Sequence, residues 1–448
     1  MSLLLDRNGK PRERAILVGL ARRGGARWET EEHLQELALL TDTAGAEVIQ
    51  TFIQDRDAVD PAYFIGRGKA ESISAYAREA HADLIIFDDD LSPAQARNLE
   101  ELSGKKVLDR SGLILDIFAR RAKTREAKTQ VELAQLNYLL PRLTRQWTHL
   151  SRQVGGIGTR GPGETQLEVD RRLVRKRIST LNRELQKIQS QRAVQRQARQ
   201  RLFKIALVGY TNAGKSTLLN ALTDADVFVE DRLFATLDPT IRRMRLTPHQ
   251  QVLLIDTVGF IRKLPPDLVA SFMSTLEETV VADLLLHVID ISHPQMVEHI
   301  SAVREVLGRL HLSHKPVLHV FNKIDQLEER GAIARLKRQY APAVFVSASK
   351  GLFLRELRQR VLQLYQQSFA ELELSVSLKT GDTISRIYAL ADVLEIQYNS
   401  DRARLVVKVK TDRVAKIQQL PGVSVLDRAD AYEPAMEEVE SKTAVDGE

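Results

Sequence analysis

Residues 209–216 read G-Y-T-N-A-G-K-S, which has the spacing of a loop that binds nucleotide phosphates. The apolar segment 203–208 predicts a buried strand before it, and the segment 217–222 predicts the start of a helix after it. In such a loop the backbone wraps around an anion, and N–H groups at the helix start point toward it. Lys215 would then reach the β- and γ-phosphates, and the Ser216 hydroxyl would bind Mg²⁺. The loop alone is compatible with ATP and with GTP.

A second motif, D-x-x-G, begins at Asp256 after the apolar run 252–255 and ends at Gly259. A carboxylate at the end of a strand suits Mg²⁺, so we expect Asp256 to hold this ion as well. Gly259 would let the backbone approach a γ-phosphate closely, because glycine has no side chain. The motif therefore extends the predicted phosphate site to a metal ion and a γ-phosphate.

A third motif, N-K-x-D, runs from Asn322 to Asp325 after another apolar strand. A carboxylate at the last position can accept hydrogen bonds from the ring N–H and the exocyclic amine of guanine, and adenine has no such donor pair. The predicted strand 343–346 ends at Ser347 and Ala348, which would complete the base pocket. Three motifs in this order, each at the end of a strand, predict GTP binding.

The composition excludes several classes of site and protein. The 448 residues allow two to four domains, and the absence of cysteine excludes disulfides and thiolate metal sites. The ten histidines form no H-E-x-x-H cluster. No apolar run approaches the roughly 18–20 residues of a membrane span, and the first residues lack the apolar core of a signal peptide, so we expect a cytoplasmic protein. The net charge of +6 and the pI near 9.3 suggest nucleic acid or an anionic surface as a partner.

Residues 1–122 alternate strand-like and helix-like segments, which predicts a small parallel α/β domain with helices packed on its sheet. The predicted strands are 15–19, 46–53, 84–88 and 107–108. The predicted helices are 31–41, 69–80 and 93–102, and a further helix starts near Ser111. The segment 64–69, F-I-G-R-G-K, resembles a phosphate loop but lacks its four-residue spacer, so a tight turn before a helix is the favoured interpretation.

Residues 123–201 carry apolar side chains three and four residues apart in two runs, which predicts two helices that pack along a narrow seam. The first run is Leu133, Leu136, Leu140, Leu143, Trp147 and Leu150, and the second is Val174, Ile178, Leu181, Leu185 and Ile188. Pro141 should kink the first helix. A glycine-rich break at 155–163 separates the runs, so we predict an antiparallel helical hairpin with a glycine-rich tip.

Positive charge concentrates on the second helix of this hairpin, since residues 171–201 contain eleven Lys or Arg and one acid, Glu184. An ordinary solvated helix face would carry both signs and form ion pairs within the helix. A helix with a strongly basic face is typical of phosphate contacts, so we predict that the hairpin binds RNA and that its tip orders on a partner. The candidate RNA contacts are Gly155, Gly156, Arg160, Arg171, Arg172, Arg175 and Lys176.

We expect residues 202–369 to form a GTP-binding domain, in which parallel strands end in the nucleotide motifs and helices cover both faces of the sheet. Residues 370–427 predict a small α/β domain, with strands 374–378, 393–397 and 405–409 and helices 379–390 and 413–420. Residues 428–448 are acidic and poor in apolar side chains, so we expect a disordered tail. The predicted fold class is therefore multidomain α/β, with a helical hairpin after the first domain.

The chain resembles the HflX family of bacterial ribosome-associated GTPases along nearly its whole length. The resemblance is carried by 155–168 (GGIGTRGPGETQLE), the phosphate loop, 234–242 (FATLDPTIR), 256–260 (DTVGF) and the N-K-x-D motif. The order of the predicted domains is also that of the family. The resemblance implies a GTPase that binds the large ribosomal subunit and, in its GTP state, splits stalled ribosomes under stress such as heat. We expect Mg²⁺ as the cofactor and a monomeric protein.

The resemblance also implies a set of site residues. The predicted GTP-binding residues are Gly209, Tyr210, Thr211, Asn212, Ala213, Gly214, Lys215, Ser216, Phe234, Ala235, Thr236, Leu237, Asp238, Asp256, Thr257, Val258, Gly259, Asn322, Lys323, Ile324, Asp325, Ser347, Ala348 and Ser349. The predicted metal ligands are Ser216, Thr236 and Asp256, with Thr240 as the alternative to Thr236. The residues expected to act in hydrolysis are Lys215, Thr236, Gly259 and Asn212. Asn212 resembles the asparagine of potassium-assisted GTPases, so K⁺ is a further expected cofactor.

Phe260 comes directly after the D-x-x-G motif, where many GTPases place a glutamine that orients the attacking water. Phenylalanine cannot form a hydrogen bond to water, and the family shares this feature. It predicts slow intrinsic hydrolysis and help from the surface of a partner. Two other interpretations of the chain are a ribosome-assembly GTPase of the Obg type and an RNA-binding structural factor that holds GTP without hydrolysing it.

Overall fold

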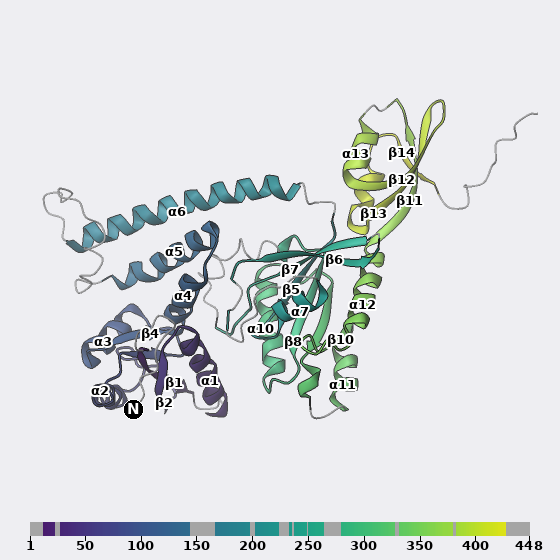
Figure 1. Cartoon of the computed structure of the whole chain (residues 1–448). Coiled ribbons are helices and arrows are strands. Elements are labelled where there is room, and N and C mark those ends of the chain that lie inside the picture. The colour runs from purple at the N-terminus through teal and green to yellow at the C-terminus, as the bar shows by residue number, and fades with distance from the viewer. Residues whose placement is uncertain are drawn as a thin grey trace, which may run out of the picture. The chain divides into compact units, whose positions relative to one another are not determined.

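A computed structural model of the chain describes most of its residues (Figure 1). The described residues are 12–22, 27–143, 166–197, 202–223, 233–234, 237–248, 250–263, 279–327, 331–379 and 382–426, and the side chains of 166–167, 192–197 and 332 are not among them. The chain divides into two compact units, residues 1–357 and 358–448. The predicted tail at 428–448 and the hairpin tip at 155–163 lie outside the described residues.

The N-terminal part contains a parallel sheet of four strands in the order β2-β1-β3-β4. The strands are β1 Arg14–Ala21, β2 Glu47–Asp55, β3 Leu84–Phe87 and β4 Lys106–Asp109. Four helices alternate with them, α1 Arg27–Thr43, α2 Arg67–Glu79, α3 Pro93–Ser103 and α4 Arg110–Arg121. The predicted alternation and the parallel sheet are thus confirmed.

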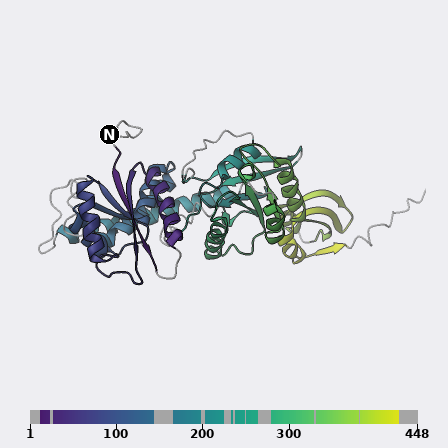
Figure 2. The ribbon, with the colours of Figure 1, turned by 90° about the horizontal axis from the view of Figure 1, so that it is seen from below.

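The helices cover the two faces of this sheet, as Figure 2 shows. On one face α1 and α4 pack through Leu37 and Ile114, and on the other α2 and α3 pack through Ile73 and Leu99. A tight turn does precede α2, but it lies at 60–64, just before the predicted segment 64–69: the backbones of Asp60 and Phe64 exchange hydrogen bonds of 2.9 and 3.0 Å, and α2 begins at Arg67. Both faces are therefore covered, and the loops at the carboxyl ends of the strands remain for contacts with other elements.

Two long helices, α5 Arg125–Leu139 and α6 Gln166–Gln197, run side by side (Figure 1). The predicted seam is present in the described residues, since Leu133, Val174 and Leu181 are buried, whereas Trp147 and Leu150 lie outside them. The prediction of a kink at Pro141 is wrong, because α5 ends at Leu139 and Pro141 lies in a short 3₁₀ turn, Leu140–Arg142. Proline removes a backbone donor and here ends the helix instead of bending it.

The GTP-binding part contains a six-stranded sheet in the order β10-β9-β8-β5-β7-β6. The strands are β5 Lys204–Gly209, β6 Thr240–Thr247, β7 Gln250–Asp256, β8 Leu284–Asp290, β9 Val317–Asn322 and β10 Ala343–Phe345. All neighbours are parallel except β6, which pairs with β7 in the antiparallel sense. The accompanying helices include α7 Lys215–Leu222, α10 Met296–Arg309 and α11 Gly331–Gln339. The carboxyl ends of β5, β7 and β9 meet at one edge, which brings the three predicted motifs together.

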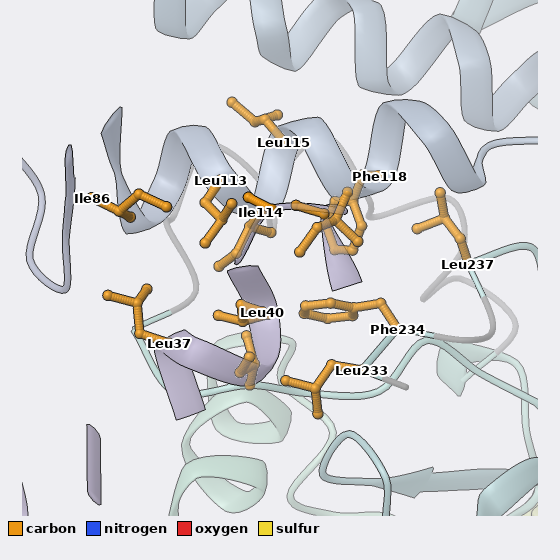
Figure 3. Packing of buried hydrophobic residues seen from close by; sticks show 14 of the residues in the cluster. Leu37, Leu40, Ile86, Leu113, Ile114, Leu115, Phe118, Leu233, Phe234 and Leu237 are labelled. Atoms are coloured by element: carbon orange, nitrogen blue, oxygen red, sulfur yellow. The ribbon is translucent and has the colours of Figure 1, made fainter. Parts of the chain in front are cut away.

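The N-terminal and GTP-binding parts of this unit share one hydrophobic cluster (Figure 3). From the N-terminal part it takes residues of α1 and α4, such as Leu40 and Phe118, and from the GTP-binding part it takes Leu233, Phe234 and Leu237. Phe234 and Leu237 belong to the segment that carries the F-A-T-L-D-P-T-I-R sequence. The N-terminal domain therefore packs directly against a predicted nucleotide-contacting loop.

The second unit contains an antiparallel sheet in the order β12-β13-β11-β14. The strands are β11 Phe369–Ser377, β12 Ala391–Tyr398, β13 Arg402–Lys410 and β14 Val423–Leu426, with helices α13 Thr383–Leu390 and α14 Val414–Gln418, and α12 Leu354–Gln367 precedes them along the chain. The three predicted strands are present, and β14 is a fourth that the sequence pattern does not predict. The core of the sheet is built from alternate residues of β13, such as Leu405 and Val407, because side chains alternate across a strand.

No helix in the described parts of the chain is long and apolar enough to cross a membrane. The domain boundaries at 122, 201, 369 and 427 stay predictions.

Candidate nucleotide-binding site

The predicted phosphate loop connects β5 to α7, as expected from the sequence. Gly214 precedes α7 with a φ of 89°, and a Cβ placed there would lie 2.3 Å from Asn322 Nδ2. Glycine is therefore required at this position both by the backbone angle and by the neighbouring strand. Asn212 also has a positive φ, 60°, which asparagine tolerates better than most residues, and its side chain is exposed.

Lys215 is buried at the centre of the loop. Its Nζ donates to the carbonyl oxygens of Gly209 and Tyr210, at 3.2 and 2.9 Å. Burial lowers the pKa of Lys215 to about 8, although the Asp256 carboxylate acts in the opposite direction. A phosphate bound at this position would favour the charged form of the lysine.

Ser216 and Asp256 bring two oxygen ligands together beside the loop, because the Ser216 hydroxyl donates to Asp256 Oδ2 at 2.6 Å. Mg²⁺ prefers oxygen ligands and is usually held by one or two protein groups together with phosphate oxygens. The pair fits the predicted metal site. Thr236 lies outside the described residues, and the alternative, Thr240, begins β6 opposite Asp256.

The D-x-x-G segment is attached to the phosphate loop through its backbone. Thr211 N donates to the carbonyl oxygen of Phe260 at 2.8 Å, and Phe260 N donates to the carbonyl oxygen of Gly209 at 3.0 Å. At Gly259 a Cβ would lie 2.9 Å from Thr211 Cα and 3.0 Å from Lys215 Nζ. Only glycine allows this close approach, so the backbone of Gly259 lies beside the lysine that is expected to meet the γ-phosphate.

The side chain of Phe260 points away from the phosphate loop. It is 2% exposed and packs in a cluster with Val208, Leu285 and Val303. The sequence predicts that this residue cannot orient water, and the structure adds that its ring anchors the D-x-x-G segment in the core. The anchoring role could not be read from the motif, because it depends on α10 and β8.

Asn322 connects the base-binding motif to the phosphate loop. Its Nδ2 donates to the carbonyl oxygen of Ala213 at 3.0 Å, and its Oδ1 accepts from Ala348 N at 3.0 Å. Asp325 lies in the short turn Ile324–Gln326 after β9 and is exposed, as a residue that binds guanine must be. The structure thus brings together the three segments that the sequence predicts for the base and phosphate sites.

Lys323 has a structural partner that the N-K-x-D motif does not predict. Its Nζ lies 2.7 Å from Asp290 Oδ2, at the end of β8. The only signal in the sequence is that Asp290 comes after an apolar run, as Asp256 does. Ser347 is fully buried and its hydroxyl accepts from Lys350 N, so it shapes the loop that carries Ala348 and Ser349.

The described residues of the predicted contact segment 234–238 have partners in the N-terminal domain and at the start of the hairpin region. Phe234 and Leu237 are in the cluster shared with α4, and Asp238 accepts hydrogen bonds from Lys123 N and Thr124 N at 3.0 and 3.2 Å. Ala235 and Thr236 are outside the described residues. Contact of these five residues with GTP stays a prediction.

Thr257 and Val258 have packing roles in the structure. The Thr257 hydroxyl donates to the carbonyl oxygen of Leu207 at 2.6 Å, and Val258 belongs to the shared cluster. The side chain of Tyr210 stacks on His299 of α10, with ring centroids 3.7 Å apart. The side chain of Tyr210 therefore packs against α10, and only its backbone belongs to the phosphate loop.

The predicted RNA contacts on α6 differ in exposure. Arg172, Arg175 and Lys176 are exposed, whereas Arg171 is half-buried and donates to the carbonyl oxygen of Leu143 at 3.2 Å. Arg177, which is not among the candidates, forms a two-bond ion pair with Glu132 of α5, at 2.6 and 2.8 Å. Gly155, Gly156 and Arg160 lie outside the described residues.

Comparison with known proteins gives matches over the three corresponding parts of the chain. Residues 31–119 match the family "GTP-binding GTPase N-terminal", residues 121–199 match "GTP-binding GTPase Middle Region" and residues 204–323 match "50S ribosome-binding GTPase". The "GTPase HflX" of Flavobacterium psychrophilum is 52% identical over 70% of this chain and 76% of its own length. The chain belongs to the HflX family of GTPases. The same family name is carried by a relative from Escherichia coli (48% identity, 80% of this chain and 85% of its own) and one from Magnetococcus marinus (44%, 91% and 94%).

Membership of the HflX family confirms the predicted GTPase activity. The two alternative interpretations, an assembly GTPase of the Obg type and a structural factor that holds GTP without hydrolysing it, receive no support from these relatives. The described site of this HflX-family chain brings together the phosphate loop, the D-x-x-G segment and the base-binding segment.

Proposed function

We propose that this chain is a cytoplasmic GTPase that binds the large ribosomal subunit, splits stalled ribosomes in its GTP state and leaves the subunit after hydrolysis. The proposal rests on one observation above all: a GTP site and a helical hairpin with an exposed basic face occur in one compact unit. The family description that matches residues 204–323, a ribosome-binding GTPase, supports the same partner.

The basic face is suited to RNA because its cationic side chains are exposed to solvent. Arg172, Arg175 and Lys176 are exposed on successive turns of α6, while Arg177 holds α6 on α5 through Glu132. An exposed row of cations contributes to affinity mainly through phosphate neutralisation, which releases counterions. The hairpin would therefore bind ribosomal RNA with a marked dependence on salt.

Hydrolysis of GTP moves the γ-phosphoryl group to water, and the chain contributes position and charge. Lys215 and the loop N–H groups would neutralise the phosphate oxygens, and the backbone of Gly259, which approaches Lys215, would add its N–H group. Mg²⁺, held by Ser216 and Asp256, would supply further positive charge when it is bound. Phe260 offers no hydrogen bond to water, so the group that orients water would come from the ribosome.

The test is GTP hydrolysis with and without purified large subunits, followed by sedimentation of intact ribosomes with GTP, GDP or a non-hydrolysable analogue. We expect strong stimulation by the large subunit and subunit release with GTP and the analogue, but not with GDP. Fast hydrolysis without ribosomes would show that water is oriented internally. Intact ribosomes under all three conditions would contradict the splitting function.

A triple variant, R172Q/R175Q/K176Q, tests the basic face. We expect weaker binding to the large subunit by about tenfold or more, and a shallower dependence on KCl by roughly one unit of the log–log slope per lost phosphate contact. The matched control is R335Q/K337Q/R338Q, which removes three exposed charges from α11. Equal losses in both variants would mean that net charge alone determines binding.

A further inference from the structure

Asp88 lies at the position in the N-terminal sheet where α/β proteins of this type usually bind ligands. The chain passes from β1 to β2 on one side and then to β3 on the other side of β1, so the order reverses between β1 and β3. Ligands bind outside the carboxyl ends of the strands at such a point. Asp88 comes directly after β3, and its backbone N–H donates to the carbonyl oxygen of Val18 in β1 at 3.0 Å.

The occupant of this position is a segment of the GTP-binding domain. Lys263 Nζ donates to Asp88 Oδ2 at 2.8 Å, and Arg262 Nη2 lies 3.7 Å from the same oxygen. Lys263 also donates to Asp89. Both basic residues come from the stretch a few residues beyond the D-x-x-G motif, so the sheet holds the end of that segment as it would hold a cationic ligand.

The other oxygen of Asp88 faces its own domain. Arg110 Nη1 donates to Asp88 Oδ1 at 2.7 Å, and Arg110 Nη2 donates to Glu36 of α1. Asp88 is 3% exposed and Arg110 is 1% exposed. Buried charges are costly unless they are paired, so each of these groups depends on its partners. Although burial alone would raise it, Arg110, Lys263 and Arg262 lower the pKa of the Asp88 carboxyl.

Tyr210 of the phosphate loop completes these contacts into a closed series, which we call the contact ring. Its hydroxyl donates to Glu36 Oε2 at 2.8 Å and accepts from Arg262 N at 2.9 Å. The ring therefore runs from Asp88 through Arg110, Glu36 and Tyr210 to the backbone of Arg262, and returns through Lys263. It crosses between the two domains twice and joins the phosphate loop to the D-x-x-G segment.

Gly259 lies in the stretch 256–263, whose far end is held by the contact ring. One end of the stretch is Asp256 at the end of β7, and the other end is Lys263 on Asp88. Between them Gly259 approaches Lys215, since a Cβ at Gly259 would be 3.0 Å from Lys215 Nζ. Phe260 also holds this stretch, through its backbone bonds to Gly209 and Thr211, and the contact at Lys263 is a second restraint beyond it. Without this second restraint the stretch would more often adopt conformations in which Gly259 is not beside Lys215.

We propose that Asp88 is a positioning residue for GTP: by holding Lys263 it keeps Gly259 where the γ-phosphate binds. GDP has no γ-phosphate, so it gains nothing from the position of Gly259. The contact at Asp88 therefore increases the preference of the site for GTP over GDP, because the ordering of the segment precedes binding. In this way the carboxyl edge of the N-terminal sheet, where Asp88 lies, influences which nucleotide the GTP site binds. This inference concerns nucleotide binding and does not depend on the ribosome.

The experiment is the affinity of the full chain for fluorescent GDP and for a fluorescent non-hydrolysable GTP analogue, with Mg²⁺, in Asp88→Asn and in Lys263→Met. We expect each variant to lower the GTP-to-GDP affinity ratio by about five- to tenfold, with the affinity for GDP unchanged. The double variant should lower the ratio no further than either single variant, because both remove the same contact.

Lys263→Met keeps the proposal testable if Asp88→Asn fails to fold, because the Lys263 side chain is 35% exposed and Arg110 still pairs with Asp88. The matched control is Glu32→Gln, which removes one negative charge from α1 where it accepts from Gln295, just before α10 and away from the D-x-x-G segment. The proposal is overturned by an unchanged ratio in Lys263→Met, by equal losses of GTP and GDP affinity, or by an equal change in Glu32→Gln.

Discussion

The ring of Phe118 in α4 lies edge-on to the ring of Phe234, with centroids 4.6 Å apart and planes at 78° (Figure 3). Phe234 comes from the loop between α7 and β6, in which GTPases of this family are expected to contact Mg²⁺ and the γ-phosphate. An edge-to-face pair adds about 0.5–1.5 kcal/mol beyond the burial of the two rings. The N-terminal domain therefore contacts both segments that are predicted to meet the γ-phosphate, one through this aromatic pair and the other through Asp88.

We predict that Phe118→Leu and Phe234→Leu are coupled. Each should destabilise the full chain by about 1–2 kcal/mol, and the double variant should lose less than the sum by about 0.5–1 kcal/mol. Urea unfolding of the four proteins measures this coupling. Phe64→Leu, in the pair Phe64–Phe87 on the opposite face of the N-terminal sheet, serves as the control and should be additive with Phe234→Leu.

Asn322→Asp separates the two bonds of Asn322. The variant keeps an oxygen for Ala348 N but loses the donor to the Ala213 carbonyl, and it places two acceptors face to face. We expect weaker binding of GTP and GDP alike, by roughly tenfold, because the phosphate loop is used by both nucleotides. Fluorescence titration with both nucleotides measures the change. A loss confined to GTP would show that Asn322 acts on the γ-phosphate instead of on the loop.

The potassium hypothesis is tested at Asn212, which is exposed at a positive φ in the phosphate loop. We expect GTP hydrolysis with large subunits to be faster in KCl than in NaCl, and Asn212→Ala to lower the rate in KCl to that in NaCl. Alanine is less favourable at this φ, so Asn212→Gly is needed as a second variant that relieves the backbone. Equal rates in the two salts for the unchanged chain would remove K⁺ from the mechanism.

Acid should destabilise the protein through its buried histidines. Burial lowers the pKa of His287 to about 3, with smaller contributions from His319 and Arg304. The unfolded chain binds a proton at this residue near pH 6.5 and the folded chain does not, so stability present above pH 6.5 is lost as the pH falls toward 3. The expected slope is about 1.4 kcal/mol per pH unit for His287.

Urea unfolding at pH 7, 6 and 5 measures this slope. His287→Asn should make the dependence on pH shallower, whatever its effect on stability at pH 7. His314→Asn, at an exposed position, is the control and should leave the slope as it is. An unchanged slope in His287→Asn would mean that His287 is protonated in the folded protein at these pH values.

The phosphate loop, Asp256 and Asn322 could be predicted because their signals are local. In each case an apolar run predicts a strand, and the motif comes directly after it, so the parallel sheet brings the motifs to one edge. The contacts of Asp88 could not be predicted in this way. Its partner Lys263 lies 175 residues further along the chain, and no spacing rule connects them.

Phe260 and Pro141 show a second kind of limit. The type of residue at 260 predicts that no water is bound there, but its position in the core depends on α10 and β8, which the motif does not include. Pro141 predicts an interruption, and the choice between a kink and an end depends on the conformation of the residues after the proline. Similarly, the antiparallel direction of β6 depends on its pairing with β7 and not on its own composition.

The cluster shared by the two domains has a consequence during protein synthesis. The apolar face of α4 is complete once residue 121 has been made, but its partners from Leu233 to Ile261 are made roughly a hundred residues later. At about 5–20 residues per second this takes on the order of ten seconds, during which the nascent N-terminal domain carries Phe118 and its neighbours uncovered. We therefore expect the emerging chain to depend on a chaperone until the GTP-binding domain has been made and covers this face.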